Sequence, residues 1–219
     1  MNAATTNEFP MVKEASFPQE LAHELLDKYG SPLYVYDADV LRQTIHRIAE
    51  SVYFPRARFC FASVTNGNIA LLGIFREQNW GLHANSPGDV HLGLRAGFAP
   101  EQIVYSGSNL NRSEMKQMLE WKVGTLNLDS LSQLELLCET YEGREVAPQI
   151  GLRLNLPELT GETRIGLRPA EIAEALTIVR AAGLKVSGIH FYRGTATNST
   201  TAFVDSIATV LEAGKALPD

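Results

Sequence analysis

Cysteines, long apolar runs and clusters of basic residues are all scarce in this chain of 219 residues. Its two cysteines, Cys60 and Cys138, cannot build a disulfide framework, so we expect two inert thiols in a reducing compartment. No stretch reaches the roughly 20 apolar residues that span a bilayer, and residues 1–18 lack the basic and apolar regions of a signal peptide. The sequence therefore predicts a cytoplasmic protein that is neither exported nor inserted into a membrane.

The charge of the chain excludes another class of partner. The formal net charge is -6, the isoelectric point is about 5.4, and lysine and arginine nowhere cluster. A nucleic-acid-binding surface needs cations to neutralise a row of phosphates. We therefore expect no nucleic-acid partner. With 45% hydrophobic and 20% charged residues, the composition is that of an ordinary globular protein of one or two domains.

Residues 1–30 are expected to form an N-terminal extension with one short helix. Apolar residues in the second half of this segment follow helical spacing up to Gly30, and glycine is suited to end a helix because it readily adopts positive φ. The β-branched and aromatic run at residues 33–37 predicts a strand, and the apolar spacing of residues 41–52 predicts a helix. Residues 31–219 are assigned to one domain.

A repeating pattern of strands and helices occupies the rest of the chain. Short apolar runs recur six times, and a helical stretch follows each, which predicts a parallel α/β sheet. No glycine-rich dinucleotide fingerprint follows a strand, so the pattern favours a (β/α)8 barrel over a doubly wound sheet. The runs are residues 58–63, 81–86, 103–107, 125–130, 149–155 and 185–191.

The helices carry recognisable start and stop signals. A polar side chain that caps a helix accepts hydrogen bonds from N–H groups that would otherwise be unpaired. The helix of residues 170–183 is amphipathic and ends at Gly183. The expected starts are Ser86 before Pro87, Asn111 with Glu114 three residues later, and Ser130 with Gln133 three residues later.

Six strand–helix units are two fewer than a complete barrel has. The helix of residues 201–215 leads only to Asp219, so we expect a barrel domain truncated before its seventh strand. Such a sheet has two open edges, and open edges pair with other chains. The sequence therefore predicts a homo-oligomer or association with a complementary chain.

Polar residues follow the strands, where barrels carry their chemistry. These stretches resemble a known family, the fold type III pyridoxal-phosphate decarboxylases, whose barrel is shared with alanine racemase. The resemblance covers about residue 30 to the end and rests on the order and spacing of six segments. They are GSPLYVYDADVLRQTI, FASVTNGN, AGFAPEQIVYSG, LNLDSLSQLELL, LRLN and GIHFYRGT.

The resemblance implies an amino-acid decarboxylase ancestry, with diaminopimelate decarboxylase the most similar in general look. It also places Val64 where the family has the lysine that forms a Schiff base with the cofactor, and valine has no amine. None of the six lysines is placed to substitute: Lys13 and Lys28 precede the barrel, Lys122 and Lys185 come just before strands, and Lys116 and Lys215 lie on helices. We expect pyridoxal phosphate to bind non-covalently and weakly, or not at all.

Other departures from the family are Tyr192 in place of a ring-stacking histidine, His83 in place of a common aspartate, and Asp89 in place of a glutamate. The glycine-rich phosphate loop, the acidic partner of the pyridine nitrogen and the C-terminal β-domain of the family are expected to be absent. As a small-molecule partner, the resemblance implies an amino acid, of a type that the sequence does not identify, or a ligand like pyridoxal phosphate. The residues to which the resemblance assigns cofactor contacts are Asn66, Ser86, Arg153, His190, Tyr192, Gly194 and Thr195; Asp129 is also retained.

Each of these residues has a structural alternative. Arg153 could pair with Asp129, and His190 could be a hydrogen-bonded core histidine. Asn66 and Asn68 are typical turn formers, Asp129 with Ser130 fits a helix N-terminus, and Gly194 with Thr195 fits a tight turn. His83 and His190 lack the spacing of a metal motif, so no metal is assigned.

Three interpretations follow. The chain is a decarboxylase homologue that is inactive in this form because of Val64, or it is a non-catalytic regulatory or binding module that pairs with an active paralogue or a separate C-terminal polypeptide. A repurposed barrel fragment with another ligand is a third.

Overall fold

The computed structural model describes residues 18–141, 143, 146–156, 165–194, 200–215 and 217. The chain divides into two units, Met1–Asp37 and Ala38–Asp219. In the first, helix α1 (Gln19–Tyr29) ends at Gly30, whose φ is +79° and whose N–H donates to the carbonyl of Leu26 at 2.8 Å. The predicted glycine-terminated helix is confirmed.

The predicted strand at residues 33–37 is wrong. This segment has no regular secondary structure, and the side chains of Tyr34 and Tyr36 are exposed. Aromatic and β-branched residues favour a strand only where a neighbouring strand supplies hydrogen bonds and side-chain packing. No such neighbour occurs for it within the described residues, so the intrinsic preference is not realised.

The second unit is built on one parallel sheet of six strands in the order β1-β2-β3-β4-β5-β6. Every neighbouring pair is parallel, so each strand lies beside the one that precedes it in the sequence. The six predicted strand–helix units are confirmed, with strands shorter than the apolar runs. The strands are β1 (Cys60–Ala62), β2 (Gly81–Ala84), β3 (Ile103–Tyr105), β4 (Thr125–Leu128), β5 (Gln149–Arg153) and β6 (Val186–His190).

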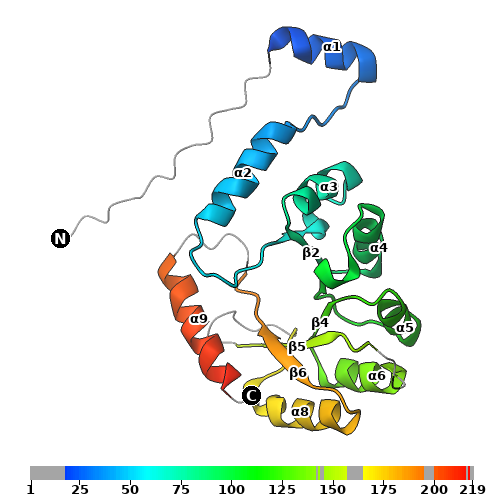
Figure 1. Ribbon diagram of the computed structural model, residues 1–219, viewed down its shortest axis with the longest axis vertical. Helices are drawn as coiled ribbons and strands as arrows, with labels where there is room; N and C mark the ends of the chain where they lie inside the picture. The colour runs from blue at the N-terminus through cyan, green and yellow to red at the C-terminus, as the bar shows by residue number, and fades with distance from the viewer. Residues whose placement is uncertain are drawn as a thin grey trace, which may run out of the picture. The chain divides into compact units, whose positions relative to one another are not determined.

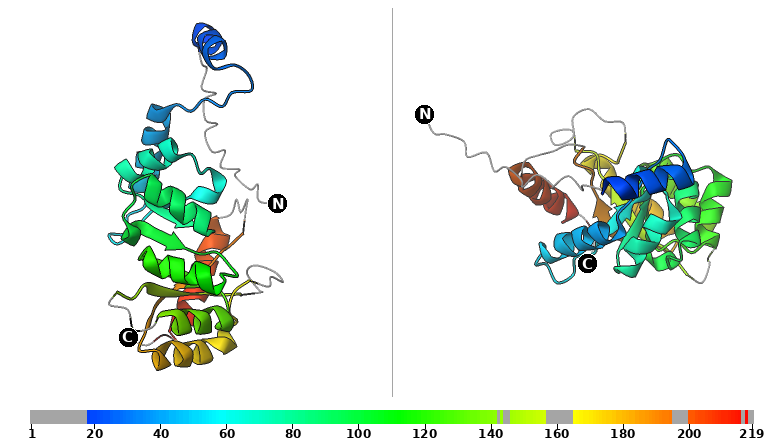
Figure 2. Two further views of the ribbon diagram at one scale, coloured as in Figure 1. Left: turned by 90° about the vertical axis from the view of Figure 1, so that its right-hand side faces the viewer. Right: turned by 90° about the horizontal axis from the view of Figure 1, so that it is seen from above.

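Helices cover the outer face of this sheet. Figure 1 shows α3, α4, α5, α6 and α8 following one another along the strands, and the second view agrees (Figure 2). Helix α2 packs against α3, and α9 contacts β6. The helices are α2 (Ala38–Glu50), α3 (Ile69–Glu77), α4 (Pro87–Arg95), α5 (Arg112–Glu120), α6 (Leu131–Tyr141), α8 (Ile172–Ala181) and α9 (Thr200–Gly214), with short 3-10 turns at Ser63–Thr65, Pro100–Gln102 and Pro169–Glu171.

The expected helix starts are confirmed. The Ser86 hydroxyl accepts from the N–H of Asp89 at 3.2 Å, and Asn111 and Glu114 form the reciprocal capping box. The Ser130 hydroxyl accepts from the N–H of Gln133 at 3.4 Å. The Gln133 side chain does not complete a second box, because its amide instead bonds both backbone groups of Leu110 and ties α6 to the loop before α5.

The hydrophobic core lies between the sheet and these helices. Leu82, Ile103, Leu126 and Ile150 are fully buried on the outer face of successive strands. Gly93 on α4 allows the helix to approach closely, because a Cβ there would lie 2.2 Å from the Leu82 side chain. Side chains alternate across a strand, so residues next to these in sequence face the inner side of the sheet.

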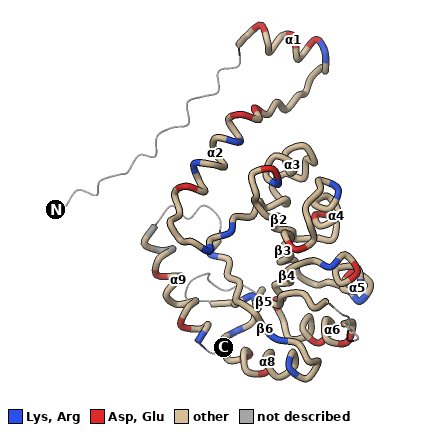
Figure 3. The backbone as a smooth tube through the Cα atoms, viewed as in Figure 1, with Lys and Arg blue, Asp and Glu red and all other residues tan. Residues whose placement is uncertain are grey.

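Acidic and basic residues are interspersed along the outer helices of the described chain (Figure 3). This distribution provides no concentrated basic surface along α4, α5 and α6. Among the residues that the structure describes, no helix combines the length and the apolar character needed to cross a lipid bilayer.

Candidate functional site

Two histidines from distant strands meet on the inner side of the sheet. His83 lies in β2 and His190 ends β6, yet their ring centroids are 5.9 Å apart and the rings are inclined by only 28°. In a flat sheet, four strand spacings of about 4.8 Å would separate these strands by about 19 Å. The sheet is therefore curved as in a barrel, and its curvature assembles the site.

Arg153 lies beside His190, and its charge acts on both histidines. It ends β5 directly beside His190, and its Nη1 donates to the carbonyl of Ser106 at 3.3 Å. Its guanidinium also lies 5.9 Å from the centroid of the Tyr192 ring. We call His83, Arg153 and His190 the His–Arg cluster.

The proposed pairing of Arg153 with Asp129 is not formed. No ion pair within 4.0 Å includes Arg153 among the described residues, and Asp129 accepts a short hydrogen bond from the Ser108 hydroxyl. Burial lowers the pKa of Arg153, and the more distant charge of Asp129 acts in the opposite direction. Asp129 thus favours the charged form of Arg153 without forming an ion pair with it.

The pKa values of both histidines of the cluster are lowered, which favours their neutral forms. Burial and the charge of Arg153 lower the pKa of His190 to about 4, with a smaller contribution from His83. The pKa of His83 is lowered by the same two causes, burial first, while Asp89 opposes them. His190 Nδ1 is buried without a hydrogen-bond partner among the described residues. The Nδ1 atom of His190 therefore lacks the hydrogen bond that a core histidine would make on that side of the ring.

A buried polar pair beneath the cluster was missed by the sequence analysis. Asn127 in β4 donates from Nδ2 to the hydroxyl of Ser106 at 2.8 Å, and both residues are buried. Gly151 makes room for this amide, since a Cβ there would lie 2.0 Å from Asn127 Oδ1. The sequence carries a feature that identifies this residue, because Asn127 interrupts an apolar strand at a position that alternation places on the inner face.

Val64 lies immediately after β1, on the turn Ser63–Thr65. Its side chain is 64% exposed, and the turn is fixed on either side by hydroxyl groups. Ser63 donates to the carbonyl of His83 at 3.2 Å, and Thr65 donates to the carbonyl of Ala62 at 2.7 Å. An aliphatic side chain therefore occupies an accessible, well-defined position at the carboxyl end of the sheet.

The described residues do not fit a covalently held pyridoxal phosphate. An imine with the cofactor needs a primary amine, and Val64 has none. The described lysines all lie elsewhere, on helices, just after α9 or at the amino ends of β4 and β6: Lys28, Lys116, Lys122, Lys185 and Lys215.

Asn66 and Ser86 are committed to local structure. Asn66 Oδ1 accepts from the N–H of Asn68 at 3.0 Å, and Asn68 Oδ1 accepts from the N–H of Ala70 at 2.9 Å, so the interpretation of both as turn formers is confirmed. Ser86 caps α4 and also donates to Asp89 Oδ2 at 2.9 Å. Among the hydrogen bonds between described residues, none joins the Ser86 side chain to the His–Arg cluster.

The segment after β6 carries the remaining candidates. Tyr192 is 51% exposed beside Arg153. Gly194 has a φ of +105°, which a side chain would strain, although a Cβ would meet no atom within 4 Å. Thr195 lies outside the described residues.

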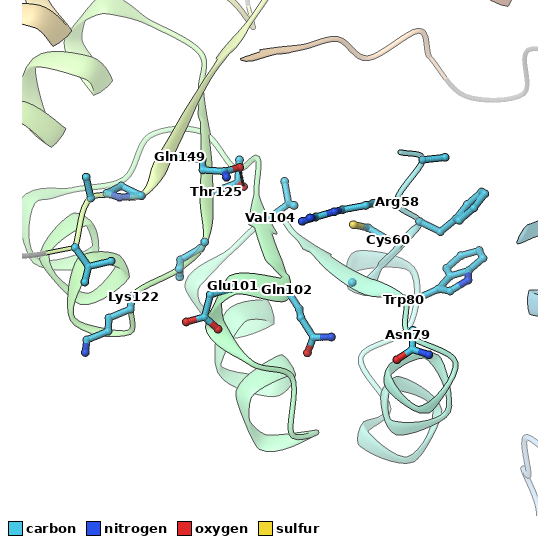
Figure 4. Close-up of a pocket in the computed structure, with 18 of the residues that line it drawn as sticks. Arg58, Cys60, Asn79, Trp80, Glu101, Gln102, Val104, Lys122, Thr125 and Gln149 are labelled. Carbon is cyan, nitrogen blue, oxygen red and sulfur yellow. Dashed lines mark hydrogen bonds between the residues drawn. The ribbon is translucent and has the colours of Figure 1, made fainter. Parts of the chain in front are cut away.

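A cavity of about 760 Å³ lies at the opposite end of the sheet. Most of the residues that line it belong to the amino ends of the strands and the loops before them, and Ala49 of α2 and Leu119 of α5 complete the lining. Figure 4 shows Arg58 and Cys60 near Val104, with Gln102, Glu101 and Lys122 along the same end. None of the predicted site residues lines this cavity. A smaller cavity of about 390 Å³ lies beside Asp129, Asn155 and Arg168.

Comparisons with known proteins agree with the strand-end motifs. Residues 38–217 match the family described as pyridoxal-dependent decarboxylase, pyridoxal binding domain. The chain is 32% identical over 200 residues to diaminopimelate decarboxylase of Methanothermobacter thermautotrophicus, covering 87% of this chain and 46% of that protein. It is 26% identical over 201 residues to L-glutamyl-[BtrI acyl-carrier protein] decarboxylase of Niallia circulans, covering 87% and 47%.

Solved structures show the same fold. Diaminopimelate decarboxylase from Helicobacter pylori complexed with L-lysine superimposes with a TM-score of 0.80 at 23% identity, covering 89% of this chain and 52% of that one. The arginine decarboxylase of Paramecium bursaria Chlorella virus gives a TM-score of 0.75 at 17% identity, covering 90% and 54%. The chain spans about half the length of the relatives it matches. It belongs to the pyridoxal-dependent decarboxylase family, and residues 38–217 correspond to the pyridoxal-binding barrel domain of that family.

Proposed function

We propose that this chain is a non-catalytic member of the pyridoxal-dependent decarboxylase family. The observation that carries the proposal is Val64, an exposed aliphatic side chain at the position where the resemblance expects the cofactor's lysine. In the family's chemistry the lysine holds the cofactor as an imine until the substrate replaces it. A chain without that amine has no covalent hold on the cofactor and no lysine to exchange with an amino acid.

Among the described residues, no other group near position 64 supplies this chemistry. Arg153 remains a cation and makes no imine, and the two histidines of the cluster lack a primary amine. We therefore propose that pyridoxal phosphate binds weakly or not at all. The contacts that the resemblance assigns to Asn66, Ser86, Arg153, His190, Tyr192, Gly194 and Thr195 become, in this proposal, contacts of a non-covalent ligand at most.

A regulatory role through pairing with another chain is the second candidate. Helix α9 exposes Val204, Ile207 and Leu211, which lie on one face by helical spacing. The edge strands β1 and β6 each have one strand neighbour within the described part of the chain. Apolar helix faces and open strand edges are surfaces that other polypeptides cover, so both features support a second copy, an active paralogue or a complementary chain as partner. A cytoplasmic location is also proposed, supported by the two free cysteines.

Covalent trapping tests the proposal for Val64. The full chain is incubated with pyridoxal phosphate, reduced with borohydride, and analysed by intact mass and peptide mapping. We expect no specific adduct on the natural chain, and an adduct on residue 64 in the Val64→Lys variant, because that substitution restores an amine at an accessible turn. Thermal unfolding of both proteins shows that each is folded.

The result that contradicts the proposal is an adduct localised to one lysine of the natural chain at stoichiometric yield. Such an adduct means that another amine holds the cofactor. If neither chain is labelled although both are folded, the assignment of position 64 as the cofactor's attachment point is wrong.

A further inference from the structure

Arg153 is a partly buried cation without a carboxylate partner within the described residues. Its hydrogen bond goes to a neutral carbonyl, that of Ser106, and its other close neighbour is the Tyr192 ring. Removing a charge from water is costly unless an opposite charge or several hydrogen bonds replace the lost hydration. Arg153 makes one hydrogen bond among the described residues, and a guanidinium has five N–H donors, so it retains donors for an added anion.

The nearest carboxylates are held by their own loops. Asp129 accepts the hydroxyl of Ser108. Asp89 Oδ2 accepts from the N–H of Asn85 at 3.0 Å and from the hydroxyl of Ser86 at 2.9 Å, so it belongs to the cap of α4. Position 83, where the resemblance expects an aspartate, carries a neutral histidine. Within the described part of the chain, the site thus offers a cation for an anionic ligand, and its two nearby carboxylates, Asp89 and Asp129, are already hydrogen-bonded.

The rest of the site presents flat and apolar groups. The neutral rings of His83 and His190 are nearly parallel, and the half-exposed Tyr192 ring and the exposed Val64 side chain add apolar surface at the same ends of the strands. Such surfaces favour contact with a flat, uncharged body. The partnerless Nδ1 of His190 leaves one buried polar atom for a ligand to satisfy.

We infer that the His–Arg cluster binds a small carboxylate with a flat apolar body and without an ammonium group. The inference rests on the proposed function, because it applies to a site in which position 64 offers no amine. It differs from amino-acid binding in the charge that the ligand carries beside its carboxylate. Arg153 receives the carboxylate, whereas an ammonium group beside the same cation is repelled, and Asp89 and Asp129, the carboxylates that act on the cluster among the described residues, are already hydrogen-bonded.

The pH dependence of binding separates this site from one that binds anions through protonated histidine. The charged and titratable groups that act on the cluster are Asp89, Asp129 and Tyr192, together with its own three members. Both histidines have pKa values below the usual 6.5. Affinity for a carboxylate should therefore change less between pH 8 and about 6.5 than it would at a site of histidines with ordinary pKa values, where recognition strengthens as the pH falls through this range.

Isothermal titration calorimetry on the full chain, with a set of matched ligands, tests the preference for a carboxylate without an ammonium group. The probes are 3-phenylpropanoate, its neutral analogue 3-phenylpropanamide, its amino analogue L-phenylalanine, and inorganic phosphate. We expect 3-phenylpropanoate to bind at least about tenfold more tightly than the amide and L-phenylalanine, as loss of a charge-assisted hydrogen bond implies. Ring-proton NMR signals of His83 and His190 should shift on binding.

Variants assign the binding to Arg153. Arg153→Gln should weaken 3-phenylpropanoate binding at least about tenfold, and Arg153→Lys should restore only part of it because lysine keeps the charge without the two-pronged geometry. Arg95→Gln removes the same charge from an exposed position in the last turn of α4 and should leave binding unchanged. Thermal unfolding confirms that each variant is folded.

The failures are distinguishable. Equal binding of 3-phenylpropanoate and L-phenylalanine, binding insensitive to Arg153→Gln, or Arg153-dependent binding of phosphate alone overturns the inference while the trapping result for Val64 stands. A covalent cofactor adduct on the natural chain overturns the proposed function, whether or not the carboxylate binds. Absence of any binding by a folded chain overturns the inference alone.

Discussion

The two faces of the six-stranded sheet follow different rules. The outer face carries large aliphatic residues such as Leu82, Leu126 and Ile150, all fully buried under helices. The inner face carries His83, Asn127 and Arg153 at alternating positions of the same strands. The outer face holds the apolar core beneath the helices, and the inner face carries the polar His–Arg cluster. Val64 lies on the exposed turn after β1 and belongs to neither buried layer, so the residue type at this position is independent of the packing of the core.

Adjacent residues of β4 provide the sharpest test of this difference. Leu126→Ala removes a fully buried side chain from the outer face and should lower the free energy of unfolding by about 2–5 kcal/mol. Asn127→Ala removes an inner hydrogen bond to Ser106 and should cost about 1–3 kcal/mol. Chemical denaturation of both variants gives the comparison. A larger loss for Asn127→Ala would show that the polar inner layer, and not the apolar outer one, dominates stability.

The pH dependence of stability isolates the inner face. His190 has a pKa of about 4 in the folded chain against about 6.5 when unfolded, so the unfolded state binds more protons between these values. The contribution of neutral His190 to the free energy of unfolding should thus be complete above pH 6.5. It should be lost as the pH drops toward 4, which lowers the free energy of unfolding by an amount on the order of 2 kcal/mol.

The variant His190→Gln should flatten this slope, because it removes the group that must be protonated. His23→Gln, on an exposed face of α1, is the matched control and should leave the slope unchanged. Denaturation midpoints measured from pH 4 to 8 decide the matter. An identical slope in natural and His190→Gln proteins would mean that His190 titrates normally.

The outer face was predictable from the sequence and the inner face largely was not. Helical spacing, Ser86, Asn111 and Gly183 located the helices because capping and periodicity are local properties. The meeting of His83 with His190 depends on the curvature of the whole sheet, which no short segment encodes. The failed strand at residues 33–37 has the same cause: a strand needs a partner, and local preference contains no information about one.

The caps of the outer helices should give the smallest effect. Asn111→Ala removes the acceptor for the N–H of Glu114 at 3.0 Å and breaks the capping box of α5, so the free energy of unfolding should fall by about 1 kcal/mol. Asn111→Asp keeps an acceptor at the helix N-terminus and should be nearly neutral, because a carboxylate is also favoured there. Denaturation of the pair measures the cap alone. Equal losses in both variants would indicate that Asn111 contributes through its neighbours and not through the cap, and that the outer face holds its helices by apolar burial without help from their ends.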